Sequence, residues 1–302
     1  MQIIGPEIEP RLDWLALTDA LAQGHELPRA EIADSFLYRG KDTLLTRSAW
    51  IDGLGMAVKP ATIFPDNPGR GVPAVNGAVA LLDDATGQLR ALVDFHLVTK
   101  WKTAGDSLLS ARRLARTDAR RVLVIGAGAV AESMVHAYRA LIPDAQVCIW
   151  SRSPAGAEAL AQRLSATAVR DLEPAVRDAE IIATATMATQ PVLRGEWLSP
   201  GTHVDLIGAY KADMREADDA LVAHASLFVD SRATTLGHIG ELIMPIAAGV
   251  ITAESVRGDF YDLVRPDARR RQSDDEITLF KNGGGAHLDL MIAAWIGRVM
   301  IA

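Results

Sequence analysis

A glycine-rich turn between a short apolar run and an amphipathic pattern constrains the fold of this chain more than any other stretch. Residues 122–125 are all apolar, which is typical of a parallel strand buried on both faces. Residues 126–131, GAGAVA, follow at once and open a helical pattern that continues to Leu141. This order of strand, turn and helix is the setting that the G-x-G-x-x-G/A fingerprint for dinucleotides requires. We therefore expect an α/β fold containing a Rossmann-type, doubly wound dinucleotide-binding domain.

The residues of this turn have separate roles in that interpretation. Gly126 permits the tight turn, and Gly128 lacks the Cβ that would keep a pyrophosphate away from the backbone. Ala131 lets the helix pack closely on the strand. The phosphates would then meet the free N–H groups of the first helical residues, which include Ala129 and Val130. The alternative is a βα unit that has a glycine turn and binds no ligand.

The end of the next expected strand indicates which dinucleotide is bound. That strand, residues 146–150, ends about 20 residues after the glycines, where an acidic residue would bind the ribose 2′-hydroxyl of NAD. This chain has Ser151 and Arg152 there. Because a guanidinium forms paired, charge-assisted hydrogen bonds with phosphate oxygens, we expect NADP(H) as the preferred cofactor, with NAD(H) as the second choice. Alternatively, Arg152 only solvates the end of the strand.

Composition and charge exclude several classes of function. The chain has 302 residues, enough for two domains, and its net charge of -7 argues against nucleic acid or an anionic membrane as a partner. Cys148 is the only cysteine and the seven histidines show no ligand spacing, so we expect no metal site. Early acidic residues and the lack of a long apolar run predict a cytoplasmic protein without a membrane segment.

Apolar spacing in the rest of the chain predicts a mixture of helices and strands. Lys59 lies among apolar residues in one expected strand, and a buried lysine is usually paired or catalytic because an unpaired ammonium group is costly to bury. Gly24 is expected to end the first helix. The expected elements are a helix at 13–22, strands at 32–37 and 43–46, a strand through Lys59, a hairpin of 77–82 with 90–94, a helix from Leu97, strands ending near 186, 208 and 231, and a terminal helix at 286–300.

Several short segments of the chain indicate a protein family. Each segment alone is a weak indication, but together they are specific. They are 56–59 (MAVK) followed by Phe64-Pro65, 98–104 (VTKWKTA), 124–131 (VIGAGAVA), 207–209 (IGA) with Arg215-Glu216, 228–231 (FVDS) and 278–281 (TLFK). From Leu44 to the C-terminus, the chain thereby resembles the ornithine cyclodeaminase/mu-crystallin family. Within that family it is most similar to the ketimine and Δ1-pyrroline-2-carboxylate reductase-like branch.

The resemblance implies an NAD(P)-dependent enzyme that acts on an amino acid or on its cyclic or linear imine. It also implies a homodimer, in which an N-terminal α/β substrate-binding and dimerisation domain makes the subunit contact. The C-terminal helix folds back onto that domain and completes it. We expect residues 1–112 and 281–302 to form this domain, and residues 113–280 to form the dinucleotide-binding domain.

The same resemblance suggests residues that bind the substrate carboxylate. Lys59 matches the active-site lysine of the family, and Lys102 stands where most members carry an arginine. A lysine keeps the positive charge but loses the planar, two-pronged donor, so a second contact is expected. Arg47 is the first candidate for that contact and Arg39 the weaker one, although either could be a solvated surface residue. Lys59, Lys102 and Arg47 are thus the candidate catalytic residues.

The family pattern also suggests residues near the cofactor and the pocket. Thr103 follows Lys102, and Thr186 and Met187 stand just after a strand whose end the family places near the nicotinamide ribose. Gly284 matches a glycine that borders the substrate pocket in the family. Alternatively, the glycines around it form a simple helix-entry loop.

One departure from the family pattern bears on the reaction. Cyclodeaminases carry an aspartate after the Gly-Ala pair, and this chain has Tyr210 there, which we assign to the substrate pocket. Without that aspartate, reduction of a small cyclic imine carboxylate by NADPH is the expected reaction, on Δ1-pyrroline-2-carboxylate or Δ1-piperideine-2-carboxylate. Asp213 could reach in from the same loop, so ornithine cyclodeamination remains the first alternative. A non-catalytic, crystallin-like NADPH-binding protein is the second.

Overall fold

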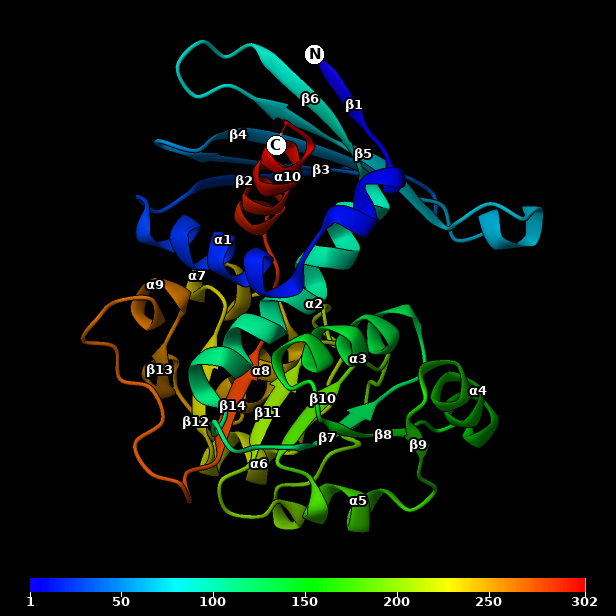
Figure 1. Ribbon diagram of the computed structural model, residues 1–302, viewed down its shortest axis with the longest axis vertical. Helices are drawn as coiled ribbons and strands as arrows, with labels where there is room; N and C mark the ends of the chain where they lie inside the picture. Colours follow the sequence, from blue (N-terminus) through cyan, green and yellow to red (C-terminus); the bar gives the residue numbers. More distant parts are fainter. Residues whose placement is uncertain (302) are drawn as a thin grey trace. The chain divides into compact units, whose positions relative to one another are not determined.

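The chain divides into two compact units, which are described one at a time. A computed structural model describes residues 1–301 (Figure 1). The first unit comprises Met1–Lys102 and Gly285–Ala302, and the second comprises Thr103–Gly284. The boundaries expected from the sequence were 112/113 and 280/281. The first of these lies inside helix α2 (Phe95–Leu114), which begins in the first unit and ends in the second.

The first unit is built on a six-stranded sheet with the order β1-β6-β5-β4-β3-β2. Strand β1 runs parallel to β6, and the other neighbours are antiparallel. The strands are β1 (Gln2–Ile4), β2 (Glu31–Arg39), β3 (Asp42–Ile51), β4 (Gly55–Ile63), β5 (Val75–Leu82) and β6 (Leu89–Asp94). Its other elements are η1 (Pro6–Arg11), α1 (Trp14–Glu26), η2 (Asn67–Arg70) and α10 (Ala286–Ile301).

Helix α10 lies at the centre of the contacts of the first unit. It packs on strands β3, β4 and β5, and α1 packs against it. Every residue from Ala286 to Gly297 is buried. Gly24 does not end α1 as the sequence suggested, because the helix continues to Glu26. A Cβ at Gly24 would lie 2.6 Å from Sδ of Met291, so this glycine permits close packing of α1 on α10.

The hairpin of β2 and β3 is longer than the sequence pattern suggested. The two strands pair from Glu31 with Trp50 down to Arg39 with Asp42, and Gly40 takes a positive φ of 59° in the turn between them. The strand interiors contain polar residues that apolar alternation does not detect. These polar residues still pair along the backbone ladder, and the strands therefore extend beyond the apolar segments.

The second unit is an eight-stranded, wholly parallel sheet with the order β13-β12-β14-β11-β10-β7-β8-β9. The strands are β7 (Arg121–Ile125), β8 (Gln146–Trp150), β9 (Thr167–Ala168), β10 (Ile181–Thr184), β11 (His203–Leu206), β12 (Ser226–Val229), β13 (Val256–Gly258) and β14 (Thr278–Lys281). The helices are α3 (Ala129–Leu141), α4 (Pro154–Leu164), α5 (Leu172–Asp178), η3 (Gly195–Trp197), α6 (Asp219–His224), α7 (Arg232–Thr235), α8 (Gly240–Ala247), η4 (Ala253–Ser255) and α9 (Phe260–Leu263).

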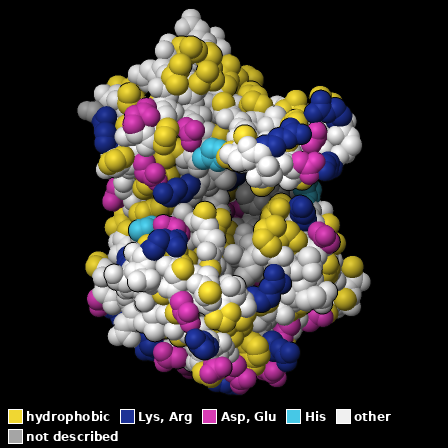
Figure 2. All heavy atoms as spheres, turned by 90° about the vertical axis from the view of Figure 1, so that its right-hand side faces the viewer, with side chains coloured by type: hydrophobic (Ala, Val, Ile, Leu, Met, Phe, Trp, Pro, Cys, Tyr) yellow, Lys and Arg dark blue, Asp and Glu magenta, His cyan; other side chains and the backbone are white. Residues whose placement is uncertain are grey.

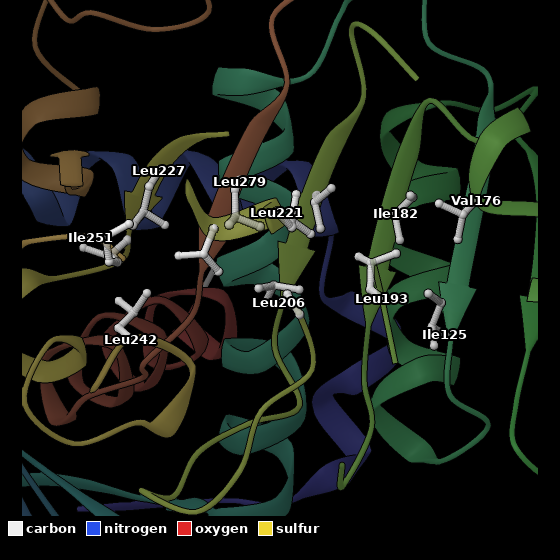
Figure 3. Packing of buried hydrophobic residues seen from close by; sticks show 14 of the residues in the cluster. Ile125, Val176, Ile182, Leu193, Leu206, Leu221, Leu227, Leu242, Ile251 and Leu279 are labelled. Carbon is white, nitrogen blue, oxygen red and sulfur yellow. The ribbon is translucent and has the colours of Figure 1, made fainter. Parts of the chain in front are cut away.

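The strand order of this sheet determines where a ligand binds. From β7 the chain continues to β8 and β9 on one side, and it then returns to β10 on the other side of β7. In an open parallel sheet, ligands bind beyond the carboxyl ends of the strands at such a reversal. The glycine turn follows β7 directly, so it lies at this point. Buried side chains from neighbouring strands of this sheet, including Ile125, Ile182 and Leu206, belong to one hydrophobic cluster (Figure 3).

The surface and the helices show two further features. On the face drawn in Figure 2, Lys and Arg side chains are interspersed with Asp and Glu side chains. Among residues 1–301, the structure has no helix with the length and apolar character needed to span a membrane.

Candidate active site

The glycine turn after β7 has the geometry of a phosphate cradle. Gly126 adopts a φ of 138°, and a Cβ there would lie 2.5 Å from the carbonyl oxygen of Ala185. Gly128 differs, because a Cβ built on it would have no protein atom within 4 Å. Protein packing therefore does not require a glycine at 128, whereas close approach of a ligand to the backbone would. Gly128 caps α3 in an extended conformation without a side-chain cap, so the site fits a dinucleotide pyrophosphate.

Ser151 and Arg152 lie beside this turn at the end of β8. The N–H of Gly126 donates to the carbonyl oxygen of Trp150 at 2.8 Å, which joins the turn to the end of that strand. Ser151 is half-buried, and its Oγ accepts a hydrogen bond from the N–H of Ser153 at 3.2 Å. The Arg152 side chain is exposed. Both residues are therefore close to the glycine turn, and their contact with a 2′-phosphate stays a prediction.

Glu216 holds the loops that follow β10 and β11. One carboxylate oxygen accepts from the N–H of Thr186 at 2.8 Å and from its hydroxyl at 2.7 Å. The other accepts from the N–H of Gly208 at 2.7 Å and of Ala209 at 3.2 Å. The neighbouring Met187 is 69% exposed, so its side chain is available to a ligand. In the sequence, Glu216 is recognisable only as part of a family motif, and its role in joining two loops was not predicted.

Two buried charged residues, Lys281 and Glu241, contact the backbone near the loops that Glu216 joins. Lys281 is fully buried, and its ammonium group donates to two backbone carbonyl oxygens at 2.7 Å, one of them that of Leu206. Glu241 accepts from the N–H groups of Glu216 and Ala217 at 2.7 and 2.9 Å. Burial raises the pKa of Glu241 to about 7, against the effect of Lys281. Burial likewise lowers the pKa of Lys281. These contacts fix the backbone on which Glu216 stands.

The two residues that the sequence assigned to the substrate pocket in this unit differ in exposure. Tyr210 is 54% exposed in the loop after β11, where Nζ of Lys211 lies 5.3 Å from its ring centroid. Asp213, in the same loop, is also exposed. Gly284 has a positive φ of 68° and donates its N–H to the buried carboxylate of Asp230 at 2.5 Å. The N–H of Gly284 is thus held by a buried carboxylate, and the place of Gly284 at the substrate pocket stays a prediction.

The first unit brings Lys59 and Lys102 together on one carboxylate. Lys59 lies on β4 and Lys102 near the middle of α2, and both are buried. Oδ1 of Asp289, on α10, lies 2.9 Å from Nζ of Lys59 and 3.0 Å from Nζ of Lys102. Nζ of Lys59 also donates to Oγ1 of Thr99 at 2.8 Å. Sequence reasoning did not identify Asp289, although a single aspartate within an apolar terminal helix was an available signal.

The pKa shifts in this cluster follow from burial and from the opposite charges. Burial lowers the pKa of Lys59 to about 8; Asp289 opposes this shift and Lys102 adds to it. Burial alone would raise the pKa of Asp289, but the two lysines outweigh it and lower that pKa to about 2. At neutral pH Lys59 is therefore mostly protonated and Asp289 is ionised. Two lysines share this one carboxylate, so the cluster has one more basic than acidic group in a buried position.

Arg47 lies next to Lys59 but already has a partner. The two residues face each other across β3 and β4, so their side chains leave the sheet on the same face. The Arg47 guanidinium binds the carboxylate of Asp34 on β2, with contacts of 2.7 and 3.0 Å. Arg39, the weaker candidate, has an 80% exposed side chain and pairs with Asp42 at 3.0 Å. Arg47 is thus close enough to influence the cluster, whereas Arg39 is a surface residue.

Thr103 follows Lys102 directly on α2 and is half-buried. It is the first residue of the second unit. Its assignment to the cofactor rests on the sequence resemblance and stays a prediction.

Comparison with known proteins identifies the family. The sequence profile of the ornithine cyclodeaminase/mu-crystallin family matches residues 49–298. The chain belongs to this family. A Delta(1)-pyrroline-2-carboxylate reductase of Paracoccus denitrificans is 59% identical over 296 residues, which cover 96% of this chain and 94% of that protein. The reductase of the same name from Colwellia psychrerythraea is 34% identical over 78% of this chain and 77% of its own length.

Solved structures have the same fold. The Delta(1)-pyrroline-2-carboxylate reductase of Thermococcus litoralis, solved with NADH and L-proline, superimposes with a TM-score of 0.90 at 24% identity, covering 100% of this chain and 98% of that one. The iminosuccinate reductase of Paracoccus denitrificans, solved with NAD+, gives a TM-score of 0.89 at 25% identity, covering 100% and 96%. The expected family, α/β fold class and enzyme class are thereby confirmed.

Proposed function

We propose that this member of the family reduces a small cyclic imine carboxylate to the L-amino acid, with Δ1-pyrroline-2-carboxylate or Δ1-piperideine-2-carboxylate as substrate. The observation that carries the proposal is the buried pair of Lys59 and Lys102 on the carboxylate of Asp289. Their net positive charge suits one substrate carboxylate, because a buried charge is stable only when it is compensated. The 59% identity to a reductase named for the five-membered imine supports this substrate class.

The side chains of the cluster have two tasks in this reaction. Lys59 and Lys102 bind the substrate carboxylate. Their two ammonium groups replace the planar, two-pronged guanidinium of the arginine that most family members carry at the position of Lys102. Arg47 adds a third contact by sharing its guanidinium between Asp34 and the substrate. Lys59, whose pKa of about 8 keeps it mostly protonated at neutral pH, also donates a proton to the imine nitrogen. A protonated imine accepts hydride more readily, so this proton transfer lowers the barrier.

NADPH is the proposed cofactor, with NADH as the alternative. The bound nicotinamide supplies the hydride that the C=N carbon receives. The absence of a carboxylate at Ser151 and the guanidinium of Arg152 support a 2′-phosphate, since a neighbouring aspartate would repel it. The residues that we assign to the cofactor are Gly126, Gly128, Ala129 and Val130 at the pyrophosphate, Ser151 and Arg152 at the 2′-phosphate, and Thr103, Thr186 and Met187 near the nicotinamide ribose.

Two other functions are disfavoured by particular residues. A cyclodeaminase needs an acid near the distal amine of ornithine, and this chain has Tyr210 at the family position. We assign Tyr210 and Gly284 to the substrate pocket. A crystallin-like binding protein would have no need for two buried lysines, which are costly to maintain.

A homodimer is proposed from the open face of the first sheet. Helix α10 covers the face that carries Lys59. Strand residues alternate between faces, so the apolar residues Leu37, Leu44 and Trp50 lie on the opposite face, where they are 68%, 37% and 49% exposed. Leu37 and Leu44 are direct partners across β2 and β3, and exposed large apolar side chains that lie side by side are typical of a protein interface.

The assay that tests the function offers both substrates to the same preparation. Incubation with Δ1-pyrroline-2-carboxylate and NADPH is expected to consume NADPH and to form proline, followed by nicotinamide absorbance. Incubation with ornithine and NAD is expected to release no ammonia. Ammonia release without imine reduction would identify a cyclodeaminase instead. Nucleotide binding with neither reaction would indicate the crystallin-like protein.

A further inference from the structure

Asp289 connects three elements of the first unit through a single oxygen atom. Oδ1 lies on α10 and contacts Nζ of Lys59 on β4 and Nζ of Lys102 on α2, at 2.9 and 3.0 Å. Oδ2 is buried and has no hydrogen-bond partner among residues 1–301. One oxygen therefore serves both ammonium groups. An arrangement that leaves the second oxygen of a buried carboxylate unsatisfied is costly, so it needs a compensating role.

The surroundings of Lys59 favour the ammonium form over the neutral amine. Its Nζ lies 4.5 Å from the ring centroid of Phe95, within the range of a cation–π interaction. Burial lowers the pKa of Lys59 to about 8, and the charge of Lys102 lowers it further, while Asp289 acts in the opposite direction. The carboxylate is thus the charged contact that keeps a proton on Lys59 near neutral pH.

The other titratable groups that face this cluster do not replace Asp289. Arg47 on β3 adds a positive charge, and its contacts are to Asp34 on β2. His287 lies one helical half-turn before Asp289 on α10 and is fully buried. Burial, together with His25 on α1 and Lys102, lowers the pKa of His287 well below its usual value, so it is neutral at neutral pH. Among these groups, the negative charge that contacts the lysines comes from Asp289.

We propose that Asp289 is a positioning residue for the reduction: it holds Lys59 and Lys102 side by side as one substrate-carboxylate site and keeps Lys59 in the ammonium form that donates the proton. This inference rests on the proposed function, and it adds the residue that controls the state of the acid. Asp289 acts through the two lysines, because its own oxygens are buried.

Two substitutions of Asp289 separate the effect of its negative charge from the effect of its size. Asp289→Asn keeps the side chain's size and one acceptor oxygen but removes the negative charge. Lys59 then loses its stabilising partner, and its pKa is expected to fall by about 1 to 3. Activity at pH 8 should therefore drop by about fivefold or more, and the loss should shrink as the pH is lowered toward 6. Asp289→Glu restores the charge and should recover the wild-type pH profile at least in part.

Two measurements test this without depending on each other. The first is trace labelling of lysine amines with acetic anhydride across pH 5 to 11, with the Lys59 peptide quantified by mass spectrometry, because only the neutral amine reacts. The second is the pH dependence of kcat for imine reduction. Asp83→Asn is the matched control, since Asp83 lies between β5 and β6 in the same unit and pairs with Arg90 at 2.9 Å. Circular dichroism at each pH confirms that the variants are folded.

In the expected result, the Lys59 labelling curve moves to lower pH in Asp289→Asn, and it returns toward the wild-type curve in Asp289→Glu. The control should match the wild type. A Lys59 curve unchanged by Asp289→Asn, or an unchanged alkaline limb of kcat, would overturn the proposal. If Asp289→Asn does not fold, the pH dependence of kcat in Asp289→Glu decides instead. An alkaline limb near that of the wild type supports the proposal, and an alkaline limb that moves to lower pH although the charge is retained overturns it. Failure of the wild type to reduce any imine would refute the proposed function, while the labelling result would still stand.

Discussion

Burial and the carboxylate of Asp289 act in opposite directions on the pKa of Lys59, the proposed proton donor. Burial lowers its pKa to about 8, whereas Asp289 raises it. As the pH rises through this value, the lysine loses the proton that it would give to the imine. We therefore expect the reduction to slow on the alkaline side. The sequence predicted Lys59 and Lys102 from their family positions, but it did not predict Asp289, because that contact joins residues 230 positions apart.

The first prediction at this scale concerns Lys59→Ala. The change removes the proposed proton donor and one carboxylate contact, so turnover of the imine should be abolished. NADPH binding should stay nearly intact, because Lys59 belongs to the first unit and the glycine turn to the second. Turnover is measured by nicotinamide absorbance and binding by fluorescence titration. Near-normal turnover in this variant would exclude Lys59 from the mechanism.

The second prediction concerns the nucleotide. If Arg152 contacts the 2′-phosphate, Arg152→Ala removes about 1.5 to 3 kcal/mol and weakens NADPH binding by one to two powers of ten. NADH affinity should hardly change. The double change Ser151→Asp with Arg152→Ala restores a carboxylate for the 2′-hydroxyl and should reverse the preference. All affinities are compared at one ionic strength. Equal affinity of the unchanged protein for both nucleotides would mean that Arg152 only faces solvent.

At the scale of elements, the sequence identified the strands and helices that carry the glycine turn but missed the contacts that join their loops. Periodicity predicted β7, α3 and β8 because each has a regular apolar pattern. Glu216 connects the loops after β10 and β11 with four hydrogen bonds, at Thr186, Gly208 and Ala209. Such a contact between loops has no local periodic signal, so only the folded chain reveals it.

The third prediction tests this connection with Glu216→Gln. The amide keeps one acceptor oxygen. Its NH2 group, however, would face N–H donors whose hydrogen bonds are accepted by the second carboxylate oxygen in the unchanged protein. We expect the free energy of unfolding to fall by about 2 to 4 kcal/mol. Glu132→Gln is the matched control, because Glu132 forms an exposed pair with Arg163 and should change stability by about 0.5 kcal/mol or less. Thermal unfolding of both variants checks this, and equal melting temperatures would contradict it.

At the scale of the whole molecule, the open face of the first sheet is the feature that a monomer does not explain. Strand β2 is the edge of that sheet and is exposed along nearly its full length. The sequence predicted a homodimer through the family resemblance. The location of the apolar face could not be predicted, because it depends on which side of the sheet α10 covers.

The fourth prediction is that Leu37→Glu weakens the dimer. A charge placed within an apolar interface is costly to bury, so the variant should sediment as a monomer at concentrations where the unchanged protein is dimeric. Val72→Glu is the control, because Val72 is similarly exposed, at 46%, but lies outside the strands. Sedimentation velocity reports both species. A dimer that persists in Leu37→Glu would place the subunit contact elsewhere.

Transfer of hydride from the nicotinamide to the C=N carbon of a cyclic imine carboxylate can be followed with a deuterated cofactor. The protein is incubated with Δ1-pyrroline-2-carboxylate and NADPH deuterated at C4 of the nicotinamide, using both stereoisomers in separate reactions. With one of the two, we predict L-proline that carries a single deuterium at Cα, detected by mass spectrometry and proton NMR. No proline, or proline without deuterium from either cofactor, would rule out hydride transfer to this carbon.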